Sequence, residues 1–235
     1  MTTIRVMDFE TTGLEPPAEV IEVGYCDLVR GDDGSWGEDR PQSWLCAVAA
    51  SPPETRAIHH ITMEETDGCP PFDAVAILQA AEHCSLIAAH NFDFELKWLQ
   101  GGLSKALCTY KAALRVWPDA PSHSNMALRY WLEDQGLLSL NSALAAPPHR
   151  AGPDAYVTAH ILKALFATGA TGKEMVAWTK QPRLFPRCPI GKFKDKPWPE
   201  VDAGFLGWML RQPTMEDDLK WNASREIARR EGRDT

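Results

Sequence analysis

Two kinds of segment and one cysteine pattern are missing from this 235-residue sequence. No apolar run approaches the roughly 18 residues that a membrane span needs, and residues 1–10 contain no apolar core of a signal peptide. The six cysteines form no C-x-x-C pair, which argues against a zinc ribbon and against a disulfide framework. These absences predict a soluble, unsecreted protein without membrane contact, located in a reducing cytoplasm.

Positive charge is scarce in most of the chain. The formal net charge is −8, whereas a generic binder of phosphates is expected to be basic, so the net charge gives no sign of nucleic acid. Residues 1–170 carry 11 lysines and arginines against 22 acidic residues, but residues 171–235 carry 13 against 10. The chain therefore has two electrostatic halves.

The length allows one substantial domain and a small appendage. We predict a main domain over residues 1–168, a linker over 169–185, and a small basic hairpin-and-helix domain over 186–235.

Two acidic residues stand at the end of the first predicted strand. Ile4, Val6, Asp8 and Glu10 share one parity, so both carboxylates would project from the same face. Like charges held this close are costly unless a proton or a cation lies between them. Oxygen ligands suit Mg²⁺ or Mn²⁺, although an Asp-x-Glu pair alone is also compatible with a solvated strand end.

Apolar periodicity and turn residues predict the order of the elements. An antiparallel meander comes first, and alternating strands and helices follow it. After the first strand, the predicted strands are residues 20–26, 43–48, 86–89 and 107–108. The predicted helices are residues 73–84, 92–100, 110–116, 125–132 with Ser124 as the N-cap, and a last one that begins at Gly152-Pro153.

The last predicted helix carries an inward-facing acid. Asp154, Val157, Ile161 and Leu165 recur at i, i+3, i+7 and i+11, which places Asp154 on the apolar face. An unpaired buried charge is costly, so this residue belongs either to a salt bridge or cap, or to a functional site.

Three local patterns stand in order along the chain: Asp-Phe-Glu-Thr-Thr-Gly-Leu at residues 8–14, Ala-His-Asn at 89–91 with acids just beyond, and His-Arg-Ala-Gly-Pro-Asp at 149–154. Together they resemble the motifs of the DEDDh family of 3′–5′ exonucleases. Segments within residues 114–128 and 190–210 also resemble exodeoxyribonucleases of this family, so the resemblance covers nearly the whole chain. It implies a ribonuclease-H-like α/β fold, a mixed five-stranded sheet flanked by helices, with a small C-terminal α+β appendage.

The resemblance implies roles for particular residues. The metal ligands would be Asp8, Glu10, Glu95 and Asp154, holding two Mg²⁺ or Mn²⁺ ions. His149 would be the general base, since the reference pKa of a histidine side chain is roughly 6.5. The pocket for the terminal nucleotide would be lined by the following residues: Thr11, Thr12, Gly13, Leu14, Thr62, His90 and Asn91.

The second motif departs from the family pattern. Counting without a gap from the His-Asn pair, the family's aspartate position falls on Glu95. In a helix Glu95 shares its face with Trp98 and Leu99, as an inward ligand should, so we prefer Glu95. Asp93 is the alternative, because a two-residue deletion would place the usual residue type there.

The resemblance implies a metal-dependent 3′–5′ exodeoxyribonuclease that hydrolyses phosphodiester bonds at single-stranded or frayed DNA 3′ ends, in DNA repair or nucleic-acid turnover. Two alternatives stay open: an exoribonuclease of the same family, and a non-catalytic proofreading or nucleic-acid-binding accessory protein. On an extended strand, Lys192, Lys194 and Lys196 would share one face, which would either meet a phosphate backbone or protect an exposed edge from pairing. The sequence identifies no protein partner.

Overall fold

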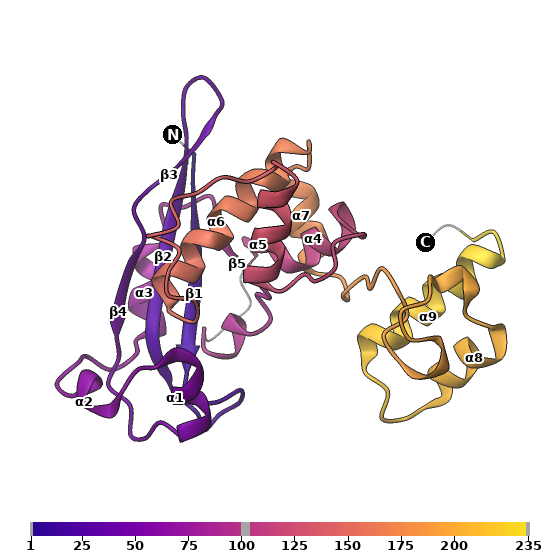
Figure 1. The fold of residues 1–235 in the computed structure, drawn as a ribbon, viewed down its shortest axis with the longest axis horizontal. Helices are drawn as coiled ribbons and strands as arrows, with labels where there is room; N and C mark the ends of the chain where they lie inside the picture. The colour runs from indigo at the N-terminus through magenta and orange to yellow at the C-terminus, as the bar shows by residue number, and fades with distance from the viewer. Residues whose placement is uncertain (1, 100–103, 234–235) are drawn as a thin grey trace.

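Two long strands form the centre of the sheet (Figure 1). A computed structural model of the protein describes residues 2–99 and 104–233. β1 pairs with β2 in the antiparallel direction and with β5 in the parallel direction, and β5 continues in parallel to β6. The strands are β1 (Thr2–Thr11), β2 (Val20–Arg30), β3 (Trp36–Glu38), β4 (Gln42–Leu45), β5 (Leu86–Ala89) and β6 (Ala106–Cys108).

β3 and β4 pair with opposite ends of β2. Residues 28–30 of β2 pair with β3, and residues 22–25 pair with β4. The two short strands therefore share one edge position, and the sheet is five strands wide, in the order β3/β4, β2, β1, β5, β6. The predicted mixed five-stranded sheet of an α/β fold is confirmed.

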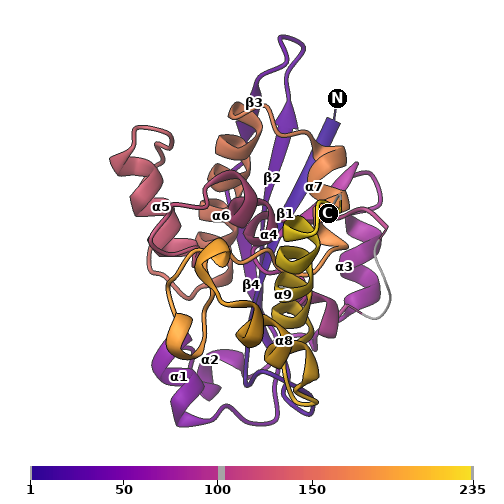
Figure 2. The same ribbon diagram turned by 90° about the vertical axis from the view of Figure 1, so that its right-hand side faces the viewer.

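Helices cover both faces of this sheet, with α4 to α7 on one face and α3 on the other (Figures 1 and 2). The helices are α1 (Pro53–His59), α2 (Met63–Thr66), α3 (Ala74–Ala80), α4 (Thr109–Val116), α5 (Asn125–Asp134), α6 (Ala151–Ala167), α7 (Gly172–Thr179), α8 (Ala203–Arg211) and α9 (Asp217–Arg230), with the 3₁₀ turns η1 (Glu95–Lys97), η2 (Gly191–Phe193) and η3 (Trp198–Glu200). Within residues 2–99 and 104–233, none of the helices has the length and apolar character needed to cross a membrane.

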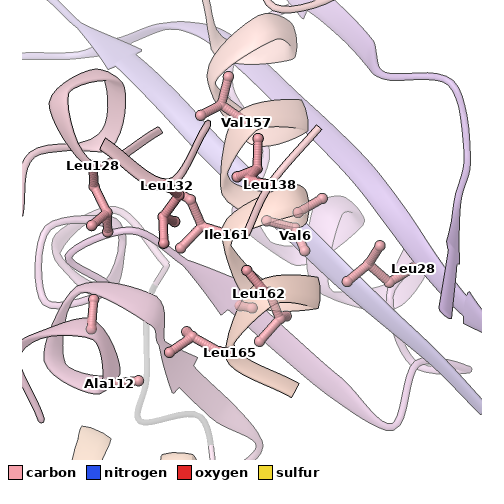
Figure 3. Close-up of a cluster of buried hydrophobic side chains, with 14 of the residues drawn as sticks. Val6, Leu28, Ala112, Leu128, Leu132, Leu138, Val157, Ile161, Leu162 and Leu165 are labelled. Carbon is pink, nitrogen blue, oxygen red and sulfur yellow. The ribbon is translucent and has the colours of Figure 1, made fainter. Parts of the chain in front are cut away.

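Side-chain alternation along β1 divides the core between the two faces. Val6 packs in the cluster that contains Ile161 of α6 (Figure 3), whereas Phe9 packs in the cluster on the α3 face. Asp8 and Glu10 continue the parity of Val6, so they project toward α6, as the strand pattern predicted.

The α-helix predicted over residues 92–100 is wrong. The structure has turns and the single 3₁₀ turn η1 there, and residue 100 lies outside the described residues. Backbone hydrogen bonds here have mixed spans. Phe94 N–H to Asn91 C=O and Trp98 N–H to Glu95 C=O span three residues, whereas Leu96 N–H to Phe92 C=O and Leu99 N–H to Glu95 C=O span four. This irregular winding buries both Glu95 and Leu99, a tertiary requirement that apolar spacing does not specify. The strand predicted over residues 86–89 matches β5 at both ends, and the other predicted elements are present with one or both ends shifted.

The linker predicted over residues 169–185 contains a helix, α7 (Gly172–Thr179). α7 lies within it and packs on β6 and α4, where Thr179 Oγ1 accepts a hydrogen bond from Cys108 N–H (2.7 Å). Farther along, Arg183 pairs with Asp218 of α9. We therefore propose that the main domain extends to residue 179 and that residues 180–182 connect it to the C-terminal unit.

The C-terminal unit, residues 183–233, has a small apolar core between α8, α9 and the preceding turns. The extended strand considered for Lys192, Lys194 and Lys196 is not present, because residues 191–193 form η2. A single antiparallel bridge between Arg187 and Pro197 stands where a hairpin was predicted. Since η2 turns the chain, these lysines do not share one strand face.

Candidate active site

The β1–β2 register places both acids of the first motif beneath the amino end of α6. Asp8 lies opposite Gly24, and Glu10 lies opposite Glu22. A β-carbon on Gly24 would overlap the backbone carbonyl of Ala151 at the start of α6. Because only glycine leaves room for this approach, Gly24 determines how close α6 lies to the acids.

Gly24→Ala is expected to lower both stability and turnover. The added methyl group meets backbone atoms, so α6 has to move away from β2. Overpacking of this kind costs about 1–3 kcal/mol, and a displacement of about 1 Å lowers kcat by about 10²-fold. Thermal unfolding and initial rates measure the two effects. Gly37→Ala, in edge strand β3 where the nearest atom is 4.0 Å away, is the matched control. A Gly24→Ala enzyme with wild-type rate and stability would contradict the expectation.

α6 brings the third motif to the same place. Asp154 is buried in the first turn of α6, and its Oδ2 accepts a hydrogen bond from His149 N–H (3.1 Å). Carboxylate oxygens of Glu10 and Asp154 and a ring nitrogen of His149 all lie within 4.8 Å of one another. His149 is exposed and has a left-handed backbone with φ 60°. Its imidazole therefore lies beside the acids while staying accessible to a substrate.

Glu95, rather than Asp93, faces this group. Glu95 is 2% exposed and lines the same pocket as Asp8 and Glu10. The Asp93 side chain is 53% exposed and pairs with Lys111 (2.9 Å). Among the described residues, the pocket lining does not include Asp93. The fold therefore favours the gap-free count, although the role of Glu95 as a ligand stays a prediction.

The pKa values of all four carboxyls are raised. Burial, reinforced by Asp154 and Glu10, holds the pKa of Asp8 well above its ordinary value. Burial and then neighbouring carboxylates raise the pKa of Glu10 to about 8 and the pKa of Glu95 to about 8. Burial raises the pKa of Asp154 to about 6. Four such groups are fully ionised near neutral pH only when positive charge compensates them.

The unsatisfied oxygens fit a cation. Glu95 Oε2 and Asp154 Oδ1 are buried and have no hydrogen-bond partner within the described part of the chain. Buried acceptors are normally satisfied, and a cation between the carboxylates would satisfy both. An all-oxygen donor set suits Mg²⁺ or Mn²⁺. The four carboxylates are therefore a chemically suitable ligand set, and the identity and number of the ions stay predictions.

Without divalent cations, the protein is expected to lose stability as pH rises. Raised carboxyl pKa values mean that the folded state binds protons more tightly than the unfolded chain, so this stability is present below about pH 4. It is lost as pH rises through about 6 for Asp154 and about 8 for Glu10 and Glu95. We expect Tm in EDTA to fall on the order of 5 °C between about pH 5 and pH 9. Added Mn²⁺ should restore Tm most strongly at the high end.

Differential scanning fluorimetry measures this dependence, and neutral variants provide its control. Glu10→Gln should raise Tm in EDTA at high pH, because it removes one of the repelling charges. Glu15→Gln, at an exposed position nearby, should not. A Tm that is independent of Mn²⁺ across this range would contradict the expectation.

The pocket beside the acids has a volume of about 570 Å³. The turn after β1 forms one side of it. Thr11 Oγ1 donates to Gly13 C=O (2.7 Å), and Thr12 Oγ1 accepts from Glu19 N–H (2.9 Å), so both hydroxyls shape this turn. Leu14 is 75% exposed and presents an apolar surface at the rim. The structure therefore brings all four predicted residues of this turn to the pocket.

His90 and Asn91 also line the pocket, directly after β5. His90 Nε2 donates to the carbonyl of His123 (2.7 Å), and Nδ1 lies 2.9 Å from Thr109 Oγ1. Burial lowers the pKa of His90 to about 4. His90 is therefore a neutral ring whose two nitrogens are both bound within the protein, which makes it a support of the pocket wall.

Thr62 was predicted to line this pocket, whereas α1 was not predicted to contribute to it. Thr62 instead caps α2 in a reciprocal pair of hydrogen bonds with Glu65, and the lining within residues 2–99 and 104–233 does not include it. Its position does not support the predicted substrate contact. The opposite wall comes from α1, where Ile58 is half exposed and His59 is buried. The available sequence signal for this wall was the isoleucine directly before the histidine pair, Ile58 before His59 and His60.

A buried ion pair beside the acids was not predicted either. Glu22 is 1% exposed and accepts two hydrogen bonds from the Arg150 guanidinium (2.9 and 3.0 Å) and one from Ala151 N–H (3.0 Å). It ties β2 to the loop that carries His149. A glutamate inside an apolar strand is a sequence signal for such a pair, because buried glutamates are nearly always partnered.

Residues 6–162 of the chain match the family model described as Exonuclease. This region is more than half of the chain and contains all four carboxylates and His149. The chain belongs to the exonuclease family. As a member it is a nuclease, a hydrolase. Exodeoxyribonuclease 10 of Escherichia coli strain K12 is 29% identical to this exonuclease over 228 residues, which cover 92% of this chain and 95% of that protein. The resemblance to exodeoxyribonucleases is therefore confirmed.

Solved structures support the same placement. One of them is the structure of Exonuclease X in complex with 5′ overhanging duplex DNA, which is 28% identical and has a TM-score of 0.59. The match covers 75% of this chain and 99% of that chain. Cell-death related nuclease 4 has a TM-score of 0.53 over 79% of this chain and 72% of its own. At 15% identity, this second likeness shows the fold alone.

Proposed function

We propose that this exonuclease is a metal-dependent 3′–5′ exodeoxyribonuclease that releases mononucleotides from free DNA 3′ ends, in cytoplasmic DNA repair or nucleic-acid turnover. The group formed by Asp8, Glu10, Glu95 and Asp154 carries the proposal, because its raised pKa values and the unsatisfied oxygens of Glu95 and Asp154 fit bound cations. Two similarities support DNA as the substrate. The chain is similar to exodeoxyribonuclease 10 over 92% of its length, and the similar exonuclease X structure contains DNA.

The residues of this site have distinct tasks in the proposed reaction. The four carboxylates would hold two Mg²⁺ or Mn²⁺ ions, which when bound acidify the attacking water and neutralise charge on the phosphate and the leaving oxygen. His149, exposed beside Glu10 and Asp154, would accept the proton of the attacking water. The adjacent Arg150–Glu22 pair would hold the loop that orients the imidazole.

The pocket supports cleavage at an end rather than within a strand. Its volume of about 570 Å³ suits one terminal nucleotide between the turn after β1 and α1. Leu14 and Ile58, on these two sides, are 75% and 50% exposed and would pack on the last base. Backbone amides of the turn would hydrogen-bond the terminal 3′ hydroxyl.

Labelled substrates test this proposal directly. With Mn²⁺ or Mg²⁺, a 3′-labelled DNA strand should release labelled mononucleotide first, whereas a 5′-labelled strand should shorten stepwise. Matched RNA strands measure the sugar preference, and faster hydrolysis of RNA would replace the proposal with an exoribonuclease. Cleavage of circular single-stranded DNA, or full activity in EDTA, would overturn it.

A further inference from the structure

The C-terminal unit carries a row of three aromatic rings, of which Trp208 is exposed and Phe193 and Phe205 are partly buried. Phe205 and Trp208 of α8 are stacked, with ring centroids 5.1 Å apart and an interplanar angle of 28°. Phe193 of η2 continues the row, with its centroid 5.2 Å from that of Phe205 and its plane tilted by 57° to it. Trp208 is 41% exposed, although it belongs to a segment with a core of its own. This exposure is unusual because a tryptophan buries more apolar area than most side chains when it can.

Glycines lie beside the Trp208 and Phe205 rings. A helical tryptophan leans toward the amino end of its helix, over the residues three and four positions earlier. For Trp208 these are Phe205, on which it stacks, and Gly204, which has no side chain to cover the ring. Gly191 has φ 63°, and a β-carbon there would lie 2.8 Å from Phe205 Cζ, so the backbone of η2 lies directly against that ring.

Cations flank the rings. Lys192 Nζ lies 4.8 Å from the Phe193 centroid, and Lys194 is exposed on the next turn. Arg211 places its guanidinium 3.2 Å from the position of a β-carbon on Gly207, next to Trp208. The pair between Lys192 and Asp202 (3.0 Å) joins side chains that are 68% and 49% exposed. Such surface pairs contribute little, so a phosphate can replace the aspartate.

We propose that Phe193, Phe205 and Trp208, with Lys192, Lys194 and Arg211, form a stacking platform for single-stranded nucleic acid. The exposed Trp208 ring, stacked on Phe205 and close to cations, matches the alternation of bases and phosphates along a strand. Charge favours nucleic acid over a protein as the occupant. Residues 1–170 carry twice as many acidic as basic residues, so they attract a polyanion weakly, and a second surface with cations would strengthen its binding. The platform would bind the strand upstream of the 3′ end that enters the catalytic pocket.

Binding measured without catalysis tests the platform. Full-length protein in EDTA is titrated into a 5′-labelled single-stranded DNA of about 30 nucleotides, and fluorescence anisotropy gives Kd. Trp208→Leu keeps an apolar side chain but removes the ring, and should weaken binding about 5- to 50-fold. Trp208→Phe should recover most of the affinity. Lys194→Glu should make binding less sensitive to salt.

Trp44→Leu is the matched control, because Trp44 is 39% exposed on β4 and lies outside the catalytic pocket. Its Kd should equal that of the wild type. Turnover of a trinucleotide in Mn²⁺ should be the same in all variants, which separates the platform from the catalytic proposal. A folded Trp208→Leu protein that binds the long strand within about twofold of wild type would overturn the platform. So would equal weakening by leucine and phenylalanine, since a phenyl ring can also stack on a base.

Discussion

Replacing Glu95 by glutamine is expected to reduce kcat by about 10³-fold or more, with little loss of folding. Glutamine preserves the size of this 2%-exposed side chain but removes the charge that the proposed cations require. Loss of a ligand withdraws several kcal/mol of stabilisation from the transition state, which corresponds to this factor. Initial rates on 3′-labelled DNA measure the effect on turnover. Calorimetric titration with Mn²⁺ should show weaker metal binding in the same variant.

Asp93→Asn is the paired control, two residues away. Its side chain is 53% exposed and pairs with Lys111, whose Nζ also donates to Thr179 C=O (3.0 Å) and so keeps a partner. We expect most activity to remain and stability to fall by about 1 kcal/mol at most. If Asp93→Asn were inactive and Glu95→Gln active, the assignment would be reversed, and Asp93 would be the fourth ligand.

Loss of the His149 imidazole is expected to lower kcat by about 10²–10⁴-fold, the range for removing a general base, with Kd for DNA nearly unchanged. The motivation is the position of its ring within 4.8 Å of Glu10 and Asp154 oxygens. Asparagine is the informative replacement, because it tolerates the left-handed backbone at φ 60° better than alanine does. Single-turnover rates measure the chemical step, and anisotropy in EDTA measures binding.

His60→Asn controls for the backbone. His60 is also exposed and left-handed, with φ 59°, but it caps the end of α1 and belongs to no catalytic motif. It should keep wild-type turnover. Near-normal turnover in His149→Asn would rule out the base assignment, and equal losses in both variants would indicate a folding defect.

The proposed site is assembled from three chain segments, and each reaches it through a different constraint. Strand alternation directs Asp8 and Glu10 to the α6 side of the sheet. The helical period directs Asp154 inward from α6. A 3₁₀ turn after β5 carries the buried Glu95, and Trp98 and Leu99 just beyond it belong to the apolar core. Only the third constraint involves an element that the sequence pattern predicted incorrectly.

What the sequence determined by itself is local and periodic. Alternation placed two carboxylates on one strand face, helical spacing turned Asp154 inward, and the order of three motifs indicated an exonuclease. Such patterns repeat over a few residues, so neighbouring positions carry enough information to predict them. The preference for Glu95 over Asp93 also came from counting, although the helix invoked for it is a 3₁₀ turn.

Tertiary structure alone decided how close these pieces come and what surrounds them. The contact of Gly24 with Ala151 and the Glu22–Arg150 pair join residues more than 120 positions apart, so no local period encodes them. The sequence of α7 was predicted to be part of a linker. In the structure this helix packs on β6, at an apolar face of the sheet. Long-range register and close packing depend on how whole surfaces fit together, and this fit sets the raised pKa values on which the proposed chemistry depends.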